Sequence, residues 1–329
     1  MSLSLCTLDS SSFPAWDRFV EESNFGTIFH STRWLSLLSK NVEVTVIKEE
    51  NEIVAGMALA KTSKSGVTGF HIPPYTQYFS PLYGKKSDKR ISISIEHECV
   101  TLLLNTLKTA GHIDFKLPAG HHTILPYHWQ GFESSVRITH IIQGTREDYL
   151  KYLNKNKLRE LRKLQDLVFN NEIAIDDHIS ENELLFLLRQ TGERKGYNTQ
   201  SSQAIKFVMN AGDSFAKKIT IRSHKHGVLA FGFFPYDNKA VYNLINASVR
   251  VNDPVLKTVN LLLLYQAIEF ALTTGRIFDF EGSMLKGVEA FCRLMGGTQV
   301  PCYRVQKSSS LRYSLMRAAN QIKNDRKKT

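Results

Sequence analysis

The sequence has 329 residues, of which 42% are apolar and 22% charged, and its formal net charge is +11. This is ordinary globular composition, and at roughly 100–200 residues per domain the length indicates two domains. No run approaches the ~18 uninterrupted apolar residues of a membrane span, and the first residues lack the basic start and apolar core of a secretory signal. The four scattered cysteines, without C-x-x-C spacing, are expected to be free thiols, so we expect a cytoplasmic protein.

The first half of the chain begins with two short helices and a hairpin. FPAWDRFVEES has Pro14 near a helix start, and STRWLSLLSK offers Ser31 or Thr32 as an N-cap. In VEVTVIKEENEIVAGMALA, two β-rich runs flank Glu-Asn-Glu and predict the hairpin. The aromatic loop GFHIPPYTQYFSPLYG follows, then a long helix expected to end at Gly111, then the strand HIDFKLPAG.

The second half repeats that order. SVRITHIIQ predicts a strand, the basic run at 146–168 predicts one amphipathic helix, and NEIAIDD predicts another strand. Helices are expected over ENELLFLLRQTGERKG and over 201–210. Three strands should then follow, at 218–223, 227–235 and 239–247.

The last predicted helix begins with Asp253 as N-cap and Pro254 as its first residue, and it stops before Gly275. The strand RIFDFEG follows. KTAGHIDFKL and TTGRIFDFEG align through Gly111 and Gly275, so helix, glycine stop and strand occur twice, each time after a hairpin. This repetition predicts a duplicated α/β unit.

The stretch FDFEGSMLKGVEAFCRLMGG carries the most distinctive chemistry. In a strand, Phe278 and Phe280 would share one face, and Asp279 and Glu281 the other, roughly 6–7 Å apart. A strand end that leads into a helix N-terminus is a common ligand position in α/β proteins. A carboxylate there can act as a general base, or it can form a structural ion pair with Arg293 or Arg276.

The residues after this strand predict a turn and a helix. Gly282 and Ser283 would make the turn, with Ser283 as candidate N-cap. The helix would bury Val288, Phe291 and Met295 and stop at Gly-Gly.

Basic residues gather in two places. KYLNKNKLRELRKLQD holds six lysines and arginines against two acids, and the tail from Lys307 holds seven against one. Such runs attract phosphates, nucleic acid or anionic lipid, or they form a solvated helix face and a frayed end. Adjacent histidines such as His121 and His122 point apart in a strand, and no ligand spacing accompanies them, so we predict no metal site.

One further group of residues is a candidate for substrate contact. Tyr75, Gln77 and Tyr78 in the proline-rich loop could line an acceptor cleft, or could simply pack over the sheet.

No Ser-His-Asp order, Walker loop or G-x-G-x-x-G is present, so hydrolase, NTPase and dinucleotide functions are not indicated.

Several of these segments, in order over residues 25 to 306, resemble the Fem family of aminoacyl transferases and their relatives with tandem GNAT acyltransferase folds. FDFEGSMLKGVEAFCRLMGG resembles the family's closing strand and helix, and YHWQGFESSVRITHIIQ its transition between domains, with an aromatic-Trp-x-Gly-Phe and a later Thr-His-x-Ile. LRELRKLQD resembles the basic helix after that transition, and ERKGY a later x-Arg-x-Gly-Phe. The family's usual Phe-Lys step is Phe291-Cys292 here, with Arg293 the nearest cation.

The resemblance implies an α/β (α+β) fold of two tandem GNAT-like domains with mixed central sheets flanked by helices. The predicted domains are 1–134 and 135–306, followed by a basic C-terminal helix over 307–329 that could pack back on the first domain.

The resemblance also implies an N-acyltransferase that moves an acyl or aminoacyl group from a thioester or ester to an amine. Glu281 is the predicted base, Asp279 its support, and Arg293 the holder of an anionic part. Ser283 is placed with the substrate, and Arg194 and Tyr197 would face the acceptor. Acyl-CoA is the expected donor and aminoacyl-tRNA the alternative.

At NDPVLKT, helix-start amides with Lys257 and Thr258 would offer the donor an anion site. The acceptor is open among small amines, amino sugars, peptidoglycan stem peptides and lipid head groups, so peripheral membrane contact is compatible with the sequence. A non-catalytic protein that binds RNA or another anion on the same fold is the rival hypothesis.

Overall fold

The computed structural model describes residues 3–40, 42–64, 67–84, 93–121, 123–195, 201–282 and 284–310. The chain forms two compact units: unit 1 holds residues up to Arg137 and from Pro301 onward, and unit 2 holds Ile138–Val300. The predicted domain boundaries differ from these divisions. The first falls slightly early, and residues 301–306, predicted in the second domain, belong to unit 1.

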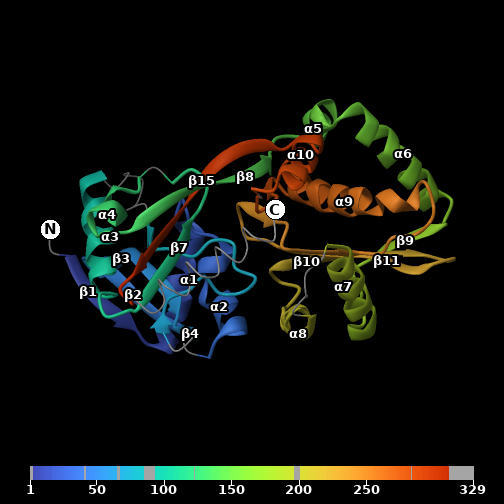
Figure 1. Cartoon of the computed structure of the whole chain (residues 1–329). Coiled ribbons are helices and arrows are strands. Elements are labelled where there is room, and N and C mark those ends of the chain that lie inside the picture. The colour runs from blue at the N-terminus through green and yellow to red at the C-terminus, as the bar shows by residue number, and fades with distance from the viewer. Residues whose placement is uncertain are drawn as a thin grey trace. The chain divides into compact units, whose positions relative to one another are not determined.

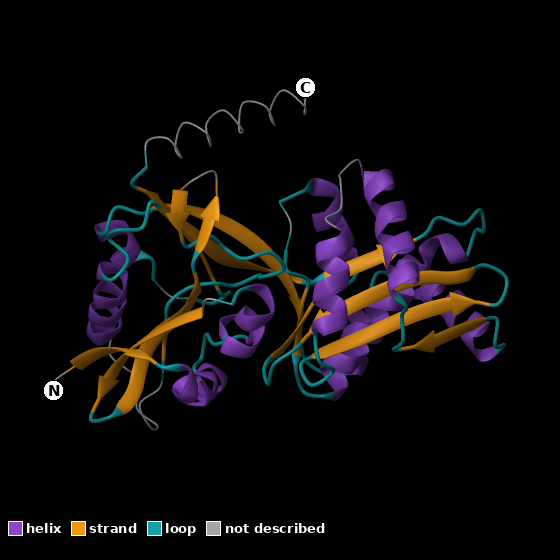
Figure 2. Cartoon of the chain, turned by 90° about the horizontal axis from the view of Figure 1, so that it is seen from below, coloured by secondary structure: helices purple, strands orange, loops and turns teal. Residues whose placement is uncertain are grey.

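Unit 1 is built on an antiparallel sheet in the order β1-β2-β3-β6 (Figures 1 and 2). Its strands are β1 (Leu3–Leu8), β2 (Val42–Glu49), β3 (Glu52–Ala60) and β6 (Leu82–Tyr83). The predicted hairpin is confirmed: β2 and β3 pair around Glu50 and Asn51, whose φ angles of 50° and 71° suit a tight two-residue turn.

Helices cover both faces of this sheet. Gly56 in β3 faces Trp16 of α1 (Phe13–Glu22), because a Cβ there would lie 2.6 Å from the indole ring. The next residue, Met57, points the other way and lines a groove with Leu107, just past α3 (Ile93–Asn105). The predicted cap of α2 (Thr32–Leu38) is confirmed, since the hydroxyl of Ser31 accepts from the amide of Trp34.

The remaining described elements of unit 1 that precede unit 2 are η1 (Ser10–Ser12), η2 (Ile28–His30), β4 (Thr62–Lys64), β5 (Val67–Gly69), β7 (His112–Leu117) and α4 (Leu125–Trp129).

The chain returns to unit 1 after residue 300. Strand β15 (Thr298–Ser308) pairs antiparallel with β7 from Tyr303 onward, and Arg304 binds Asp114 at 2.6 Å across that pair. This pairing assigns residues 301–306 to unit 1. Lys307 and Ser308 are strand residues, not the start of a helix as predicted, and the tail beyond residue 310 lies outside the described residues.

One helix end in unit 1 was predicted wrongly. Helix α3 ends at Asn105 and is followed by turns, so Gly111 is not its stop. Gly111 is needed for packing instead, since a Cβ there would lie 2.6 Å from the Val67 side chain. Gly275 does end its helix in a left-handed conformation, with φ of 70°.

Unit 2 contains a second antiparallel sheet in the order β13-β11-β10-β9. Its strands are β9 (Ile173–Asp176), β10 (Ala216–Ser223), β11 (Gly227–Pro235) and β13 (Ile245–Ser248). The single strand predicted at 239–247 is in fact two. β12 (Ala240–Tyr242) pairs in parallel with β14 (Ile277–Asp279), which pairs antiparallel with β8 (Glu133–Ile142), whereas β13 pairs with β11.

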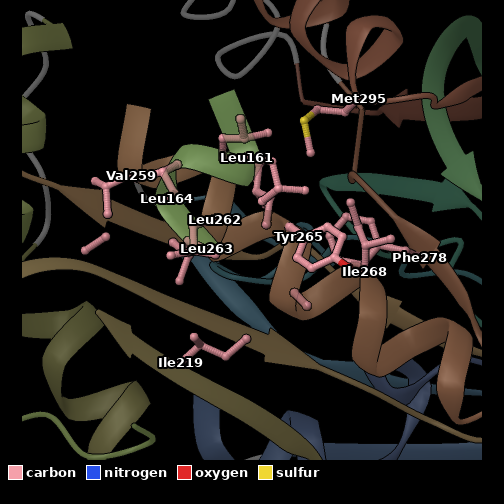
Figure 3. Packing of buried hydrophobic residues seen from close by; sticks show 14 of the residues in the cluster. Leu161, Leu164, Ile219, Val259, Leu262, Leu263, Tyr265, Ile268, Phe278 and Met295 are labelled. Atoms are coloured by element: carbon pink, nitrogen blue, oxygen red, sulfur yellow. The ribbon is translucent and has the colours of Figure 1, made fainter. Parts of the chain in front are cut away.

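The core of unit 2 is centred on helix α9 (Val259–Thr273), which is almost entirely buried (Figure 3). Figure 1 shows α9 on one face of the β10–β11 sheet, with α7 (Glu181–Lys195) and α8 (Ser201–Asn210) on the other. A sheet covered on both faces needs apolar residues throughout, and β11 is buried at every position after Gly227. Ile219 and Phe278 bring the two sheets into this core.

The basic run forms two helices, not the single helix that was predicted. α5 (Arg146–Tyr152) ends, and α6 (Lys155–Phe169) restarts after Asn154, whose side-chain oxygen accepts from the amides of Asn156 and Lys157. An asparagine N-cap satisfies the first free amides of a helix and so favours a break there. Leu161 and Leu164 then bury one face of α6.

The two units share their order of elements, as the sequence predicted. In each, an antiparallel sheet is followed by a long helix, α3 or α9, and then by a strand, β7 or β14. The predicted fold class, a mixed α/β protein with helix-flanked sheets, is therefore confirmed.

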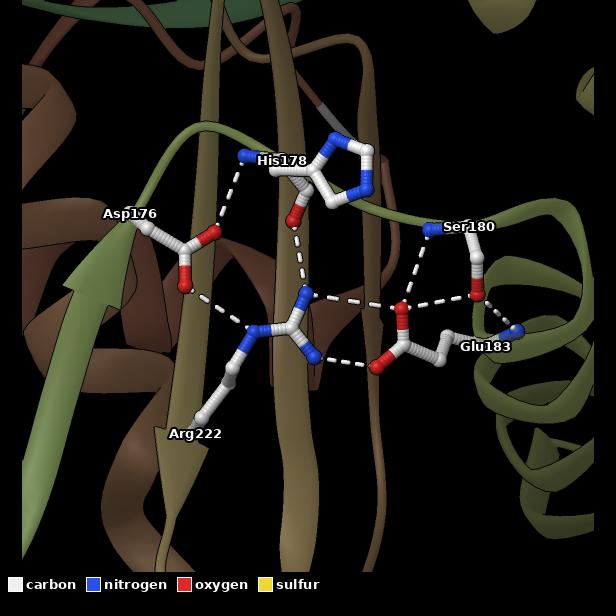
Figure 4. Close-up of polar contacts among 5 residues, drawn as sticks. All are labelled: Asp176, His178, Ser180, Glu183 and Arg222. Atoms are coloured by element: carbon white, nitrogen blue, oxygen red, sulfur yellow. Dashed lines mark hydrogen bonds and ion pairs between the residues drawn. The ribbon is translucent and has the colours of Figure 1, made fainter.

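A guanidinium ties β9, β10 and the start of α7 together (Figure 4). Arg222 donates to Asp176 at 2.9 Å and to the His178 carbonyl at 2.8 Å, and it forms an ion pair with Glu183. Ser180 and Glu183 form a capping box, because each side chain bonds the other's backbone amide. The hydrogen bond from Arg222 lowers the pKa of Glu183 from 4.5 to about 2.

This network predicts an acid-sensitive element of stability. Because folding depresses the pKa of Glu183, its contribution is present above pH 4.5 and is lost as the pH falls towards about 2. Glu183→Gln should lower the free energy of unfolding at neutral pH by roughly 1–3 kcal/mol and flatten its decline over that acid range. Urea unfolding at several pH values measures both. Glu181→Gln, at an exposed position on the same helix, is the control; equal slopes in the two variants would contradict the assignment.

Candidate functional site

The segment after β14 is held by backbone and ring contacts. Phe278 and Phe280 are both buried, with ring centroids 5.0 Å apart, as the predicted strand alternation required. The amide of Phe280 donates to the carbonyl of His140 on β8 at 2.9 Å. These contacts fix the position of Asp279 between the two phenylalanines.

Asp279 is buried, with an exposed fraction of 3%. One carboxylate oxygen accepts the Thr139 hydroxyl at 2.5 Å and the backbone amide of Glu281 at 2.8 Å. Arg293 and Arg276, the predicted structural partners, contact Glu289 and the Asp237 carbonyl respectively. Asp279 therefore shapes the turn that carries Glu281.

Glu281 lies beyond the end of β14, so strand alternation does not set its direction. Its φ is 60°, a left-handed conformation that is uncommon for a residue with a side chain, and its side chain is half-buried. Gly282 follows with φ of 68°, and a Cβ there would lie 2.1 Å from the Ile138 carbonyl oxygen. Two consecutive left-handed residues pressed against β8 form a strained turn of the kind that gathers at functional sites.

The next helix, α10 (Lys286–Leu294), buries a narrower face than predicted. Cys292 and Met295 are buried and Phe291 packs partly against the core. Val288, however, is 44% exposed, although it lies one turn before Cys292 on the same side of the helix. The predicted stop is correct: the amide of Gly296, φ 85°, bonds the Arg293 carbonyl.

A polar cluster that the sequence interpretation missed lies beside this turn. The fully buried ring of His140 has its Nε2 3.8 Å from Oε1 of Glu289, which also accepts from Arg293 and from Gln299. Within the described part of the chain, neither ring nitrogen of His140 forms a hydrogen bond. Thr139 and His140 are the Thr-His of THII, so that motif was the signal that could have found them.

The pKa values of the ionisable groups in this cluster depend on burial and on the charges and hydrogen bonds of neighbouring residues. Desolvation opposes ionisation of Glu289, but the hydrogen bond and charge of Arg293 outweigh it, so the pKa of that carboxyl lies below its usual value. Burial, followed by the charge of Glu289, raises the pKa of the Cys292 thiol to about 11. Cys292 is thus a neutral thiol at physiological pH and an inert one.

Arg194 is placed at the end of α7. Its guanidinium donates to the Ser248 carbonyl and hydroxyl, both at 3.3 Å, and Thr191 bonds the same residue. The arginine therefore braces the end of β13. Tyr197 and Ser283, the other predicted substrate contacts of unit 2, lie outside the described residues.

The predicted anion site at NDPVLKT differs from expectation. Asp253 accepts from the amides of Val255 and Leu256, both at 2.8 Å, and these bonds lower its pKa. The carboxylate therefore occupies the amides that an anion would need, and α9 begins only at Val259, after η3 (Leu256–Thr258). The Thr258 hydroxyl donates to the Val255 carbonyl, and Lys257 is exposed.

The candidate acceptor residues of unit 1 are mostly packed. Tyr78 is buried, with its ring 6.3 Å from that of Phe29 and 5.5 Å from the Lys116 ammonium, and Gln77 is buried as well. Tyr75 is half-buried with φ of 57°, and burial raises the pKa of its phenol. Of the three, Tyr75 retains the most exposed surface.

Among the described residues, no group of three or more His, Cys, Asp or Glu side chains could hold a metal ion, and no described helix is long and apolar enough to span a membrane. No protein-family model matches the sequence, and no curated protein matches it.

Solved structures do match it over most of its length. The crystal structure of FemX aligns with 91% of this chain and 96% of its own, with a TM-score of 0.69 at 14% identity. A tandem GNAT protein from the clavulanic acid biosynthesis pathway covers 94% of this chain and 99% of its own, with a TM-score of 0.55 at 9% identity. L-PGS from Bacillus licheniformis covers 94% of this chain and 95% of its own, with a TM-score of 0.55 at 13% identity. The chain has a Fem-like tandem GNAT fold. At these identities the likeness establishes the fold alone.

Within this Fem-like fold, the position where the family pattern has lysine carries no charge. Cys292 takes that place, is 3% exposed, and remains a thiol. Arg293 points outward and pairs with Glu289 at 3.2 Å. Positive charge near the turn is therefore on the surface of α10, one residue past the lysine position.

The strained turn predicts a sharp difference between two glycines. Gly282→Ala should destabilise this Fem-like protein by roughly 1–3 kcal/mol or more, because φ is left-handed and the new methyl meets the Ile138 carbonyl. Gly287→Ala in α10 meets nothing within 4 Å and should stabilise by roughly 0.5–1 kcal/mol. Thermal unfolding of both variants measures the contrast, and equal melting temperatures would count against the turn geometry.

Removing the Thr139 hydroxyl tests the support of Asp279. Thr139→Val leaves a buried carboxylate without that donor and should cost roughly 1–3 kcal/mol, whereas Thr139→Ser keeps the hydroxyl and should cost less. Denaturant unfolding compares the two. A loss in Thr139→Ser with none in Thr139→Val would mean that packing of the methyl group, and not the hydrogen bond, matters here.

Proposed function

We propose that this chain is an acyltransferase that moves an acyl or aminoacyl group from a thioester or ester donor to an amine. The observation that carries the proposal is the turn at Glu281. A carboxylate in a left-handed conformation is fixed by Asp279 and by contact with β8, on a fold shared with FemX and a tandem GNAT protein.

In the proposed reaction, the amine nitrogen attacks the donor carbonyl carbon and the bond from that carbon to sulfur or oxygen breaks. Glu281 accepts the proton that the amine loses, and the departing thiolate or alkoxide takes up a proton from solvent. Asp279 holds the turn through its bond to the Glu281 amide and is a positioning residue. Most of the rate enhancement would come from orienting the two substrates and from amides that stabilise the oxyanion.

The remaining residues would bind the substrates. Arg293 on the surface of α10 would hold an anionic part, with Ser283 nearby in sequence. Arg194 and Tyr197 are the proposed acceptor contacts of unit 2, and Tyr75, Gln77 and Tyr78 are separate candidates in unit 1. Because Tyr78 and Gln77 are buried and Tyr75 is only half-buried, Tyr75 is the strongest candidate of the three for contact with the acceptor.

We propose acyl-CoA as the donor and aminoacyl-tRNA as the alternative. One structural neighbour is described with reference to AcCoA, and another is L-PGS. Exposed Lys257, with Thr258, is the candidate contact for the donor's phosphates. Since Asp253 already occupies the nearby amides, the lysine charge is the main attraction that this segment offers.

The donor can be identified by ligand-dependent stability. Acetyl-CoA at 100 times its dissociation constant should stabilise the native state by about 2.7 kcal/mol, since a ligand that binds only the folded state shifts unfolding by mass action. A melting-temperature increase with acetyl-CoA but not with a charged tRNA supports acyl-CoA, and the reverse supports the tRNA donor. No shift with either, together with no transfer to any amine, would contradict the proposed function and favour a non-catalytic anion-binding protein.

The role of Glu281 is tested by turnover. With acetyl-CoA and a panel of amines that includes glucosamine, lysine and ethanolamine, Glu281→Gln should lower the rate of thiol release by roughly 10²–10⁴-fold while leaving donor stabilisation intact. Glu172→Gln, an exposed residue after α6, is the control and should leave the rate unchanged. Near-normal turnover in Glu281→Gln would remove the residue from the mechanism.

A further inference from the structure

Helix α6 presents a strongly basic outer face. Leu161 and Leu164 bury the inner side of the helix in the core that contains α9. The exposed residues of α6 are Lys155, Asn156, Arg159, Arg162, Lys163, Asp166 and Phe169. Their spacing of three and four places the four cations on one side of a helix about 22 Å long. Figure 1 shows α6 on the far side of α9 from the β10–β11 sheet, as the outer layer of unit 2.

These four cations differ from several other basic residues of unit 2, which are held in ion pairs. Lys157 pairs with Glu160, Arg146 with Glu269 and Arg222 with Asp176. Within the described residues, Lys155, Arg159, Arg162 and Lys163 form no ion pair, and Asp166 is the one acid on their face. Like charges gathered without counter-charges repel one another, so an anionic surface would stabilise them.

Exposed aromatic residues mark both ends of this basic face. Tyr152, at the end of α5 and just before α6, is 76% exposed. Phe169, the last residue of α6, is 87% exposed and lies seven positions beyond Arg162, on the same side of the helix. Large aromatic side chains are seldom left this open, so the partner should contain an apolar layer beneath its charge.

We propose that the α6 basic face, defined by Lys155, Arg159, Arg162 and Lys163 with Tyr152 and Phe169 at its ends, docks unit 2 on a membrane that contains anionic phospholipid. The helix lies in the plane of the surface. Its cations meet lipid phosphates, while the two rings enter the head-group boundary, where aromatic side chains are favoured.

The pattern fits a lipid surface better than a nucleic acid. Proteins that hold single strands interleave aromatic rings among the cations so that successive bases can stack. Here the rings stand at the two ends, with only polar and charged residues exposed between them. The inference does not depend on the acyl-transfer reaction, since it concerns where the protein binds and not what it catalyses.

Sedimentation with phospholipid vesicles tests the proposal on the full chain. The wild-type protein should bind vesicles of phosphatidylcholine mixed with phosphatidylglycerol. It should bind vesicles of phosphatidylcholine alone far more weakly. Arg159→Gln/Arg162→Gln should weaken binding by roughly 30-fold, the expected effect of two interfacial cations. Added salt should weaken the wild type more steeply than this variant.

A matched variant controls for net charge. Arg189→Gln/Lys206→Gln removes two exposed cations from α7 and α8, on the other side of the β10–β11 sheet, and should change binding less than 2-fold, an amount within about 0.4 kcal/mol. Phe169→Ser should weaken binding several-fold without altering the salt dependence. If Arg159→Gln/Arg162→Gln shows a lowered melting temperature, Lys155→Gln/Lys163→Gln replaces it as the test.

Several results would overturn the proposal. These are failure of the wild type to bind anionic vesicles, equal losses in the α6 and control variants, or an equal affinity for neutral vesicles. Tighter binding of an RNA oligonucleotide, lost in the α6 variant, would instead make this face a nucleic-acid site. A loss of stabilisation by acetyl-CoA or charged tRNA, with vesicle binding unchanged, would assign the face to the donor.

Discussion

The hydrogen bonds between β8 and the end of β14 determine the chemistry that unit 2 can present. The Phe280 amide bonds the His140 carbonyl, and the Thr139 hydroxyl bonds Asp279. Together they hold the end of the strand against β8, and the next two residues adopt left-handed conformations. Glu281 therefore does not continue the strand alternation that would place it on the same side as Asp279. The strain of the turn is sustained by the packed phenylalanines on either side of Asp279.

The turn at Glu281 lies between a dense apolar core and a polar cluster. α9 and the apolar strands form a continuous interior, and the β14 aromatics belong to it. The polar groups of His140, Glu289, Arg293 and Gln299 are gathered on the α10 side. The interior therefore supplies rigidity, and the α10 side supplies charge, which is the division of roles expected of a preorganised site.

Much of the fold could be predicted from the sequence because the signals were local. The hairpin at Glu50-Asn51, the helix stop at Gly275 and the burial of Phe278 and Phe280 each follow from a few adjacent residues. One error was local, because the cap at Asn154, which divides the basic helix, was overlooked. Others came where distant partners decide, as where β12 leaves its predicted strand to pair with β14. Gly111 was interpreted as a helix stop although it is there to accommodate Val67.

The candidate site was predictable in its sequence position but not in its contacts. Asp279 and Glu281 were singled out as a pair of similar carboxylates, yet one is buried as a support and the other lies in a strained turn. Alternation alone could not distinguish them, because the strand ends between them. Likewise, the amides before α9 were assigned to an anion, although Asp253, itself predicted as an N-cap, accepts from two of them.

The buried thiol of Cys292 limits what can replace it. The site holds a small neutral group, and an ammonium placed there would lose its hydration. The charge of Glu289, which contributes to the raised pKa of this thiol, would offset only part of that cost, because the same carboxylate pairs with Arg293. A positive charge beside this turn is therefore more readily provided from the surface of α10 than from position 292.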